Sequence, residues 1–299
     1  MTARAPAVAV TESTPPHWRR DLLEGIREIW RARDLVVQLA TRDIRIRHKE
    51  AVMGFAWAIV MPIMVVLSGV IIRTAMSRAT GGTINRGVIL GLGLKGLAWG
   101  FFAGAIGFGT TSLTTSGHLI SKIYFPRAAL PIATTMTQGF DISIALVAFT
   151  LVAPWLGATL SWSLAWVPVL LIMLAVLTLA AVLFLSCANV FFRDIKYMVQ
   201  VALTFGIFLT PVFFEPEMLG PAGAQLIMLN PLSPILEGLV LAVRDGHNLL
   251  EPLATVREGV SIPIWAPRYL AYSAGWAFGG LFVAAAFFRR AEAHFADFV

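Results

Sequence analysis

The sequence predicts an all-α polytopic membrane protein, and three observations support that class. Of the 299 residues, 58% are hydrophobic and 13% are charged, whereas a soluble domain has roughly 45–50% and 25%. Six apolar stretches approach the length of about 20 residues that a helix needs to cross the hydrocarbon core. The formal net charge is +6, but the basic residues lie between apolar runs and form no single polar face, so we expect no nucleic-acid partner.

The N-terminal region is predicted to stay outside the membrane core. Residues 1–20 have no continuous apolar run after a basic start, so they do not resemble a cleavable signal peptide, and we expect a disordered cytoplasmic tail. In the segment 21–51, apolar residues from Leu22 to Trp30 recur at helical spacing. This pattern predicts an amphipathic helix lying in the membrane surface, followed by a basic segment. Residues 52–299 are expected to form the transmembrane domain.

Six predicted spans alternate with loops whose charges indicate an orientation. If the N-terminus is cytoplasmic, sixteen Lys and Arg residues fall in inner segments and six in outer ones. This distribution agrees with the excess of basic residues on the cytoplasmic side of short loops. Both termini are therefore predicted in the cytoplasm and the chain in the plasma membrane. The spans are Val52–Ile72, Gly87–Ser112, Leu130–Val152, Leu164–Val190, Met198–Phe214 and Tyr269–Phe288.

The region 215–268, between the last two spans, is rich in proline and is predicted not to span. Its helix-like part, Ile235–Val243, is too short to cross the membrane. Ser233 is a candidate N-cap, with Pro234 at the first helical position. We expect either a re-entrant element or an outer cap. Lys95 in the second span, like residues 244–268, has no assigned role.

The sequence shows no motif of a catalytic, nucleotide-binding or metal site. No GxxxxGK[ST] occurs, so any dependence on ATP and Mg²⁺ must come from a partner. The five histidines are scattered and the single Cys187 lies in an apolar run, so we expect no metal site and no cofactor in this chain. A GxGxxG match at Gly91–Gly96 lies within a span. Gly96, Gly100 and Gly104 are better explained as small residues on one packed helix face.

Charged and aromatic residues supply the candidate binding positions. A basic run before the first span either anchors the chain on anionic lipid or forms a landing site for a lipid pyrophosphate. Asp141 lies within a span, where it is a pathway residue, a proton relay or, as we favour, a hydrogen-bond partner of a neutral side chain such as Gln138. The basic run comprises Arg42, Arg45, Arg47 and Lys49, and candidate channel or gate residues are Trp57, Trp99, Phe101, Asp141, Phe213 and Phe214.

Several short motifs occur in a fixed order along the chain. They are RDIRIR at Arg42–Arg47, GFAW at Gly54–Trp57 with Pro62, KIYFPR at Lys122–Arg127, FRD at Phe192–Asp194, PVFF at Pro211–Phe214 and NPLS at Asn230–Ser233. Their order is similar to that in the permease subunits of bacterial polysaccharide ABC exporters, of the type that export O-antigen and teichoic acid. Asp141 also falls where that family often has an acid.

The resemblance implies a homodimer of six-span subunits, paired with two copies of a separate ATPase, that exports an undecaprenyl-pyrophosphate-linked glycan. The segment 118–127 would be a short coupling helix that docks on the ATPase. The N-terminal helix would be an interface helix, and 215–268 would contain outward re-entrant helices that gate the exit. The coupling residues carried over from the family are Ser121, Lys122, Tyr124 and Arg127, with Arg193 and Asp194 in the second inner loop.

Two other functions stay open at this point. A permease of the same architecture could export a drug, haem or another lipid, and it would predict the same topology and the same ATPase dependence. A membrane enzyme acting on polyprenyl-linked sugars is disfavoured because the spans contain no cluster of acids and no nucleophile with a nearby base. In the resembling family the position of Lys95 is normally neutral, so this lysine is a departure from the pattern.

Overall fold

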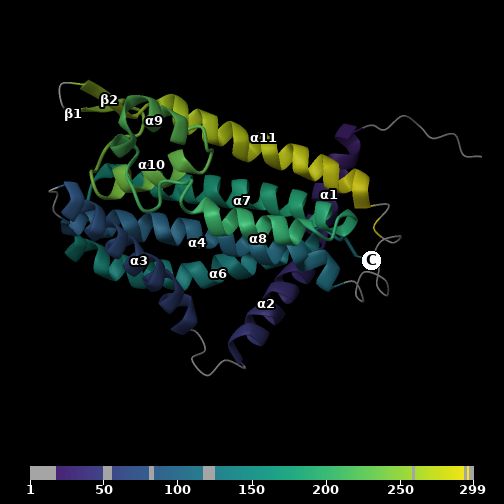
Figure 1. Ribbon diagram of the computed structural model, residues 1–299. Helices are drawn as coiled ribbons and strands as arrows, with labels where there is room; N and C mark the ends of the chain where they lie inside the picture. The colour runs from purple at the N-terminus through teal and green to yellow at the C-terminus, as the bar shows by residue number, and fades with distance from the viewer. Residues whose placement is uncertain are drawn as a thin grey trace, which may run out of the picture.

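In the computed structural model the chain forms a bundle of long helices that run side by side, with a β-hairpin at one end (Figure 1). Among the described residues, five helices are long and apolar enough to cross a membrane, which confirms the helical, polytopic class. They are α3 (Ala56–Thr80), α4 (Arg86–Thr115), α6 (Ala129–Val152), α7 (Trp166–Phe191) and α11 (Pro267–Glu292). The structure describes residues 18–49, 56–80, 84–116, 125–257, 260–292 and 295.

Two helices precede the bundle. The first, α1 (Trp18–Arg31), lies in the region where an amphipathic helix is predicted, and Trp30 near its end is 69% exposed. The second, α2 (Arg33–Lys49), packs on α6, with Leu39 among its buried residues. The position of α1 in a membrane surface stays a prediction, and most of the predicted N-terminal tail lies outside the described residues.

The bundle has two ends that carry different elements. At the terminal end, α1 meets the last turns of α11, and Arg289 Nη1 donates to Glu28 Oε2 at 2.6 Å. At the hairpin end, the start of α7 meets the loop before the hairpin, and Trp166 Nε1 donates to Asn248 Oδ1 at 3.2 Å. Both α7 and α11 run from the hairpin end to the terminal end (Figure 1). The chain between them must therefore return along the bundle.

The fifth predicted span, Met198–Phe214, is not one continuous helix. The helix α8 (Ile195–Gly206) has 12 residues, so it is about 18 Å long at 1.5 Å per residue, whereas the hydrocarbon core is about 30 Å thick. The chain then turns through residues 207–214, where Pro211 lacks the N–H that a helix interior needs. A 3₁₀ helix, η3 (Pro216–Leu219), follows.

Two short helices lead back into the bundle. They are α9 (Gly220–Ile227) and α10 (Ser233–Val243), and every residue of α10 is buried. The N-cap of α10 is Leu232 rather than the predicted Ser233, so Pro234 is the second residue of the helix rather than the first. The backbone N–H of Leu232 donates to Asn230 Oδ1 at 3.1 Å, which fixes the turn before the helix. Because α10 packs against α4, α7 and α11, an apolar helix too short to span is completely enclosed.

One β-hairpin, which the sequence analysis did not predict, lies in the region that had no assigned role. Strands β1 (Leu253–Arg257) and β2 (Val260–Trp265) form an antiparallel hairpin. Trp265 anchors it, because its side chain is buried and its Nε1 donates to the carbonyl of Leu249 at 2.8 Å. The apolar, β-branched residues of these two runs favour strands. Two further 3₁₀ helices, η1 (Ala153–Leu156) and η2 (Trp162–Ala165), connect α6 to α7.

The glycines of α4 do not form the single packed face that their spacing predicts. A Cβ at Gly96 would lie 3.2 Å from Val65 Cγ1 of α3, whereas one at Gly104 would lie 2.8 Å from Gln138 Oε1 of α6. A Cβ at Gly100 would meet nothing within 4 Å. The prediction is wrong because α4 is central, so its successive turns face different neighbours.

Candidate functional site

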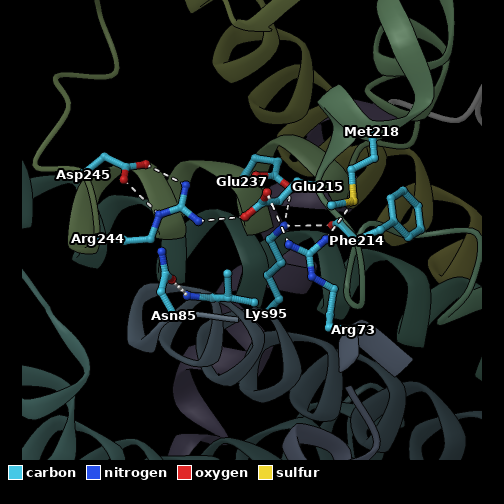
Figure 2. A network of polar contacts seen from close by, with 10 residues as sticks. Arg73, Asn85, Lys95, Phe214, Glu215, Met218, Glu237, Arg244 and Asp245 are labelled. Atoms are coloured by element: carbon cyan, nitrogen blue, oxygen red, sulfur yellow. Dashed lines mark hydrogen bonds and ion pairs between the residues drawn. The ribbon is translucent and has the colours of Figure 1, made fainter. Parts of the chain in front are cut away.

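The most buried charges lie between α4 and α10. Lys95 of α4 forms an ion pair with Glu237 of α10, and their side chains are 3% and 4% exposed. Lys95 Nζ also donates to the backbone carbonyl of Phe214 at 3.2 Å. We call the charged residues gathered here the α4–α10 charge cluster (Figure 2). Its members are Arg73, Lys95, Glu215, Glu237, Arg244 and Asp245.

Glu215 joins two arginines from different parts of the chain. Arg244, directly after α10, donates from Nη1 to Glu215 Oε1 at 2.9 Å. Arg73 of α3 places its Nη2 3.6 Å from Glu215 Oε2, and its Nη1 donates to Met218 Sδ at 2.7 Å. Arg244 is held on its other side by Asp245, at 2.8 and 3.0 Å. Figure 2 shows the Glu215 carboxylate between the two guanidinium groups.

Glycines on α4 make room for this arrangement. Gly87, Gly91 and Lys95 are four residues apart, so they lie on one face of the helix. A Cβ at Gly87 would lie 3.4 Å from Arg244 Cδ, and one at Gly91 would lie 3.8 Å from Arg244 Nη1. Arg244 can therefore extend along α4 toward Glu215. A cavity of about 10 Å³, which is room for about one water molecule, lies among Arg73, Lys95, Glu215 and Arg244.

The pKa values of Glu215 and Glu217 are shifted in opposite directions. Burial raises the pKa of Glu215, but the positive charges of Lys95, Arg244 and Arg73 outweigh it, so the net pKa lies below the ordinary value. Burial raises the pKa of Glu217, and the negative charges of Glu215 and Glu237 raise it further. The cluster thus favours an anion at position 215 and disfavours one at position 217.

A second, half-buried charge pair joins α2 to α6. Arg47 Nη1 binds the Asp141 carboxylate, and the Arg47 guanidinium lies 4.5 Å from the centre of the Phe108 ring. The favoured partner of Asp141 was a neutral side chain such as Gln138, but the structure gives it an arginine from the basic run. Gln138 instead faces Gly104 of α4. Asp141 and one candidate phosphate ligand are therefore parts of the same contact.

The other members of the basic run, Arg42, Arg45 and Lys49, differ in how available their side chains are to a ligand. Arg42 binds the neighbouring Asp43 at 2.9 Å. Arg45 is exposed, and the structure gives it no ion pair with any residue that it describes. Lys49 is the last residue of α2, and its side chain lies outside the described part. Arg45 is therefore the described member of the run that is most available to a ligand.

The coupling candidates are only partly within the described residues. Ser121, Lys122 and Tyr124 lie outside them. The backbone N–H of Arg127 donates to Glu292 Oε1 at 3.0 Å, and its Nη1 donates to the Glu292 carbonyl at 2.5 Å. The segment that follows the predicted coupling helix is thus attached to the end of α11. Arg193 and Asp194 are exposed between α7 and α8.

The candidate channel residues do not share one exposed surface. Trp99, Phe101 and Phe213 are buried in the same hydrophobic core. Phe214 is half-buried beside the α4–α10 charge cluster, whereas Trp57 of α3 is exposed. Only a rearrangement of the core could expose the three buried aromatic rings to a substrate.

Sequence reasoning missed most of the α4–α10 charge cluster. Glu237 lies 142 residues from Lys95, and no spacing rule links them. The one available signal was Lys95 itself, because an ionisable residue inside a span calls for a partner. Among the residues that the structure describes, no group of three or more His, Cys, Asp or Glu side chains could hold a metal ion.

Comparison with known proteins gives consistent matches. The family model for the ABC-2 type transporter matches residues 34–243. An O-antigen export system permease protein, RfbA, of Myxococcus xanthus is 26% identical over 249 residues, which is 82% of this chain and 94% of the relative. A protein of the same name from Klebsiella pneumoniae is 26% identical over 215 residues, which is 71% of this chain and 79% of the relative.

Proposed function

Because the chain belongs to the ABC-2 type transporter family, we propose that it is the membrane-spanning subunit of an ATP-driven exporter of a lipid-linked O-antigen polysaccharide. The observation that carries this proposal is the match to an O-antigen export permease over 94% of the length of that relative. The family model, over residues 34–243, extends from α2 to the end of α10. The chain is a multi-pass membrane protein and a transport permease, not itself catalytic.

The sixth crossing is proposed to be a composite one. The chain between α7 and α11 returns from the terminal end to the hairpin end, and α8 covers only the first part of that path. The turn 207–214 and the buried α10 would cover the rest, because irregular backbone at membrane depth is tolerated where protein encloses it. The terminal end would face the cytoplasm, and the re-entrant elements would face outward. Both termini then lie in the cytoplasm, in agreement with the distribution of basic residues.

Energy would come from a separate ATPase bound at the terminal end of a homodimer. The chain has no nucleotide-binding motif of its own, so ATP and Mg²⁺ would be bound by two copies of that partner. The segment 118–127 would dock on the ATPase, with Arg193 and Asp194 beside it. The contact of Arg127 with Glu292 supports this role, because a force on the docking segment would pass directly to the end of α11.

The lipid pyrophosphate would be met first by the basic run of α2. Arg45 is the exposed cation of that run, whereas Arg47 is already engaged by Asp141. Clustered cations at the headgroup level can bind phosphate through charge-assisted hydrogen bonds. The sugar chain would follow through a path that opens when ATP binding shifts the dimer between two packings.

Export should be tested in cells from which the gene is deleted. The proposed function predicts that they lose surface O-antigen, accumulate the polyprenyl-linked glycan inside and recover when the wild-type chain is supplied. Arg45→Glu should restore export poorly. Arg78→Glu reverses the charge of an exposed arginine in the last turn of α3 and should restore export fully. Normal surface glycan in the deletion strain would contradict glycan export and favour a drug, haem or other lipid as cargo.

The ATPase should be tested by affinity purification of the chain in mild detergent. We expect a P-loop ATPase to co-purify, and we expect Tyr124→Ala combined with Arg127→Ala to abolish its recovery. Arg268→Ala changes an exposed arginine at the hairpin end and serves as the matched control. Absence of any ATPase from a folded wild-type dimer would remove the energy source and refute the mechanism.

A further inference from the structure

We propose that Arg73, Lys95 and Arg244 form a phosphate-binding site, distinct from the basic run of α2, in which the carboxylate of Glu215 stands in for the anion. The ligand class is a phosphate or pyrophosphate group, either free or carried on a lipid. The inference rests on the proposed function in one respect, because a lipid pyrophosphate reaching the outward half of the exporter would be its natural ligand.

The first support is the environment of Arg73. Its side chain is 10% exposed, and a guanidinium carries five N–H donors. Among the described residues, it forms an ion pair with a Glu215 oxygen at 3.6 Å and donates a hydrogen bond to the thioether sulfur of Met218. Sulfur is a weak acceptor, so this buried arginine has donors to spare for a group with more oxygens. Phosphate has these oxygens, and their arrangement allows bidentate hydrogen bonds with a guanidinium group.

The second support is the balance of charge. With Glu215 in place, three cations face the carboxylates of Glu215, Glu237 and Asp245. Removing the Glu215 carboxylate leaves three cations and two carboxylates, so the cluster then has a net charge of +1 and can accept an anion. Lys95 and Arg244 are already paired with Glu237 and Asp245, so both remain in position when Glu215 leaves. Figure 2 shows that all three cations point toward the place of this carboxylate.

The third support is that Glu215 lies outside the α-helices of the bundle. It precedes η3 and follows the turn 207–214, with an extended backbone conformation. The adjoining cavity, at about 10 Å³, is too small for a phosphate. An anion would therefore bind by exchange with the Glu215 carboxylate. That exchange would release the 214–219 segment from α3 and from the end of α10.

The test measures binding of inorganic pyrophosphate to the full chain in phosphatidylcholine nanodiscs by calorimetry. Wild-type protein should bind it weakly, because the tethered carboxylate of Glu215 competes. Glu215→Gln should bind at least about tenfold more tightly, and adding Arg73→Gln to that variant should remove the gain. Glu217→Gln is the matched control two residues away and should behave as wild type. The comparison also separates this site from the basic run of α2, which is the same in all variants.

A second arm distinguishes a lipid source from a free anion. The same variants are placed in nanodiscs that contain phosphatidic acid, and their thermal unfolding is compared with that in phosphatidylcholine alone. Stabilisation of Glu215→Gln in this arm, without a gain in pyrophosphate binding, would support a lipid-borne phosphate as ligand. A variant that gains neither overturns the proposal. If Glu215→Gln is not recovered from membranes, Glu215→Asp, which withdraws the carboxylate by one methylene, takes its place. It must bind pyrophosphate more tightly than wild type, and adding Arg73→Gln must remove that gain.

Failure of this inference is distinguishable from failure of the proposed function. A chain that exports O-antigen with its ATPase, but whose Glu215→Gln variant gains no affinity for phosphate in either arm, would refute the phosphate site and leave export intact. A deletion strain with normal surface glycan would refute export, while tighter pyrophosphate binding by Glu215→Gln would still establish the site.

Discussion

Replacing Lys95 with methionine tests whether the buried ion pair holds α10 in the bundle. The substitution keeps an unbranched side chain of similar length but leaves Glu237 as a charge that is 4% exposed. Removing one partner of such a pair costs about 3–5 kcal/mol. The hydrogen bond from Lys95 to the Phe214 carbonyl is also lost, which adds about 0.5–1.5 kcal/mol. We therefore expect Lys95→Met to lower the free energy of unfolding by about 3.5–6.5 kcal/mol.

The double variant Lys95→Met with Glu237→Met separates the ion pair from packing. An apolar pair of similar volume is often as stable as a buried ion pair, so the double variant should lose only the contact with Phe214, about 1 kcal/mol. Unfolding by sodium dodecyl sulfate in mixed micelles gives the four free energies of the cycle. A single variant within about 1 kcal/mol of wild type, or a double variant as unstable as the sum of the singles, would refute the reasoning.

Three further predictions follow from contacts at other places in the bundle. Gly109→Ala should destabilise the chain by about 1–3 kcal/mol in the same unfolding assay, because its Cβ would lie 2.5 Å from a buried valine of α7. Gly100→Ala is the control and should leave the stability unchanged, because its Cβ would meet nothing within 4 Å. Asp141→Asn should speed hydrogen exchange of α2 amides by breaking the ion pair with its arginine, and α7 amides should be unchanged. Glu292→Gln should impair export while the ATPase still co-purifies, because it weakens the hold on Arg127; normal export would exclude this positioning role.

The long helices could be predicted from the sequence, because each is one continuous apolar run. The fifth span could not, since hydropathy averages count apolar residues but do not register where the helix ends. Residues 207–214 are apolar enough to extend the window, and yet the chain turns there around Pro211. The hairpin was missed for a related reason. Its strands are short, and Pro263 within β2 reduces the strand signal.

The candidate site was predictable only where one residue breaks a local rule. Lys95 does so, since a cation inside an apolar span needs a partner, but the sequence does not say which acid supplies it. Arg47 and Asp141 were both singled out, for different roles, and only the folded chain shows that they bind each other. Pairings of this kind depend on which helix faces which, and no local pattern records that.

The buried charges lie beside the part of the backbone that is not helical, and a physical reason connects the two. Backbone groups in a turn at membrane depth need partners from side chains or neighbouring backbone. In the 207–219 segment one such partner is a charged side chain, since Lys95 donates to the Phe214 carbonyl at 3.2 Å.

Lys95 can satisfy that carbonyl only if its charge is compensated, and Glu237 supplies the compensation from α10. The ion pair therefore stabilises the place where the chain leaves the helix, and Glu215 follows there with an extended backbone. A chain in which α8 continued as a helix through residue 214 would need neither Lys95 nor Glu237. Deleting both charges should therefore be tolerated for folding, as the double variant predicts, but not for export, if movement of the 214–219 segment is part of the transport cycle.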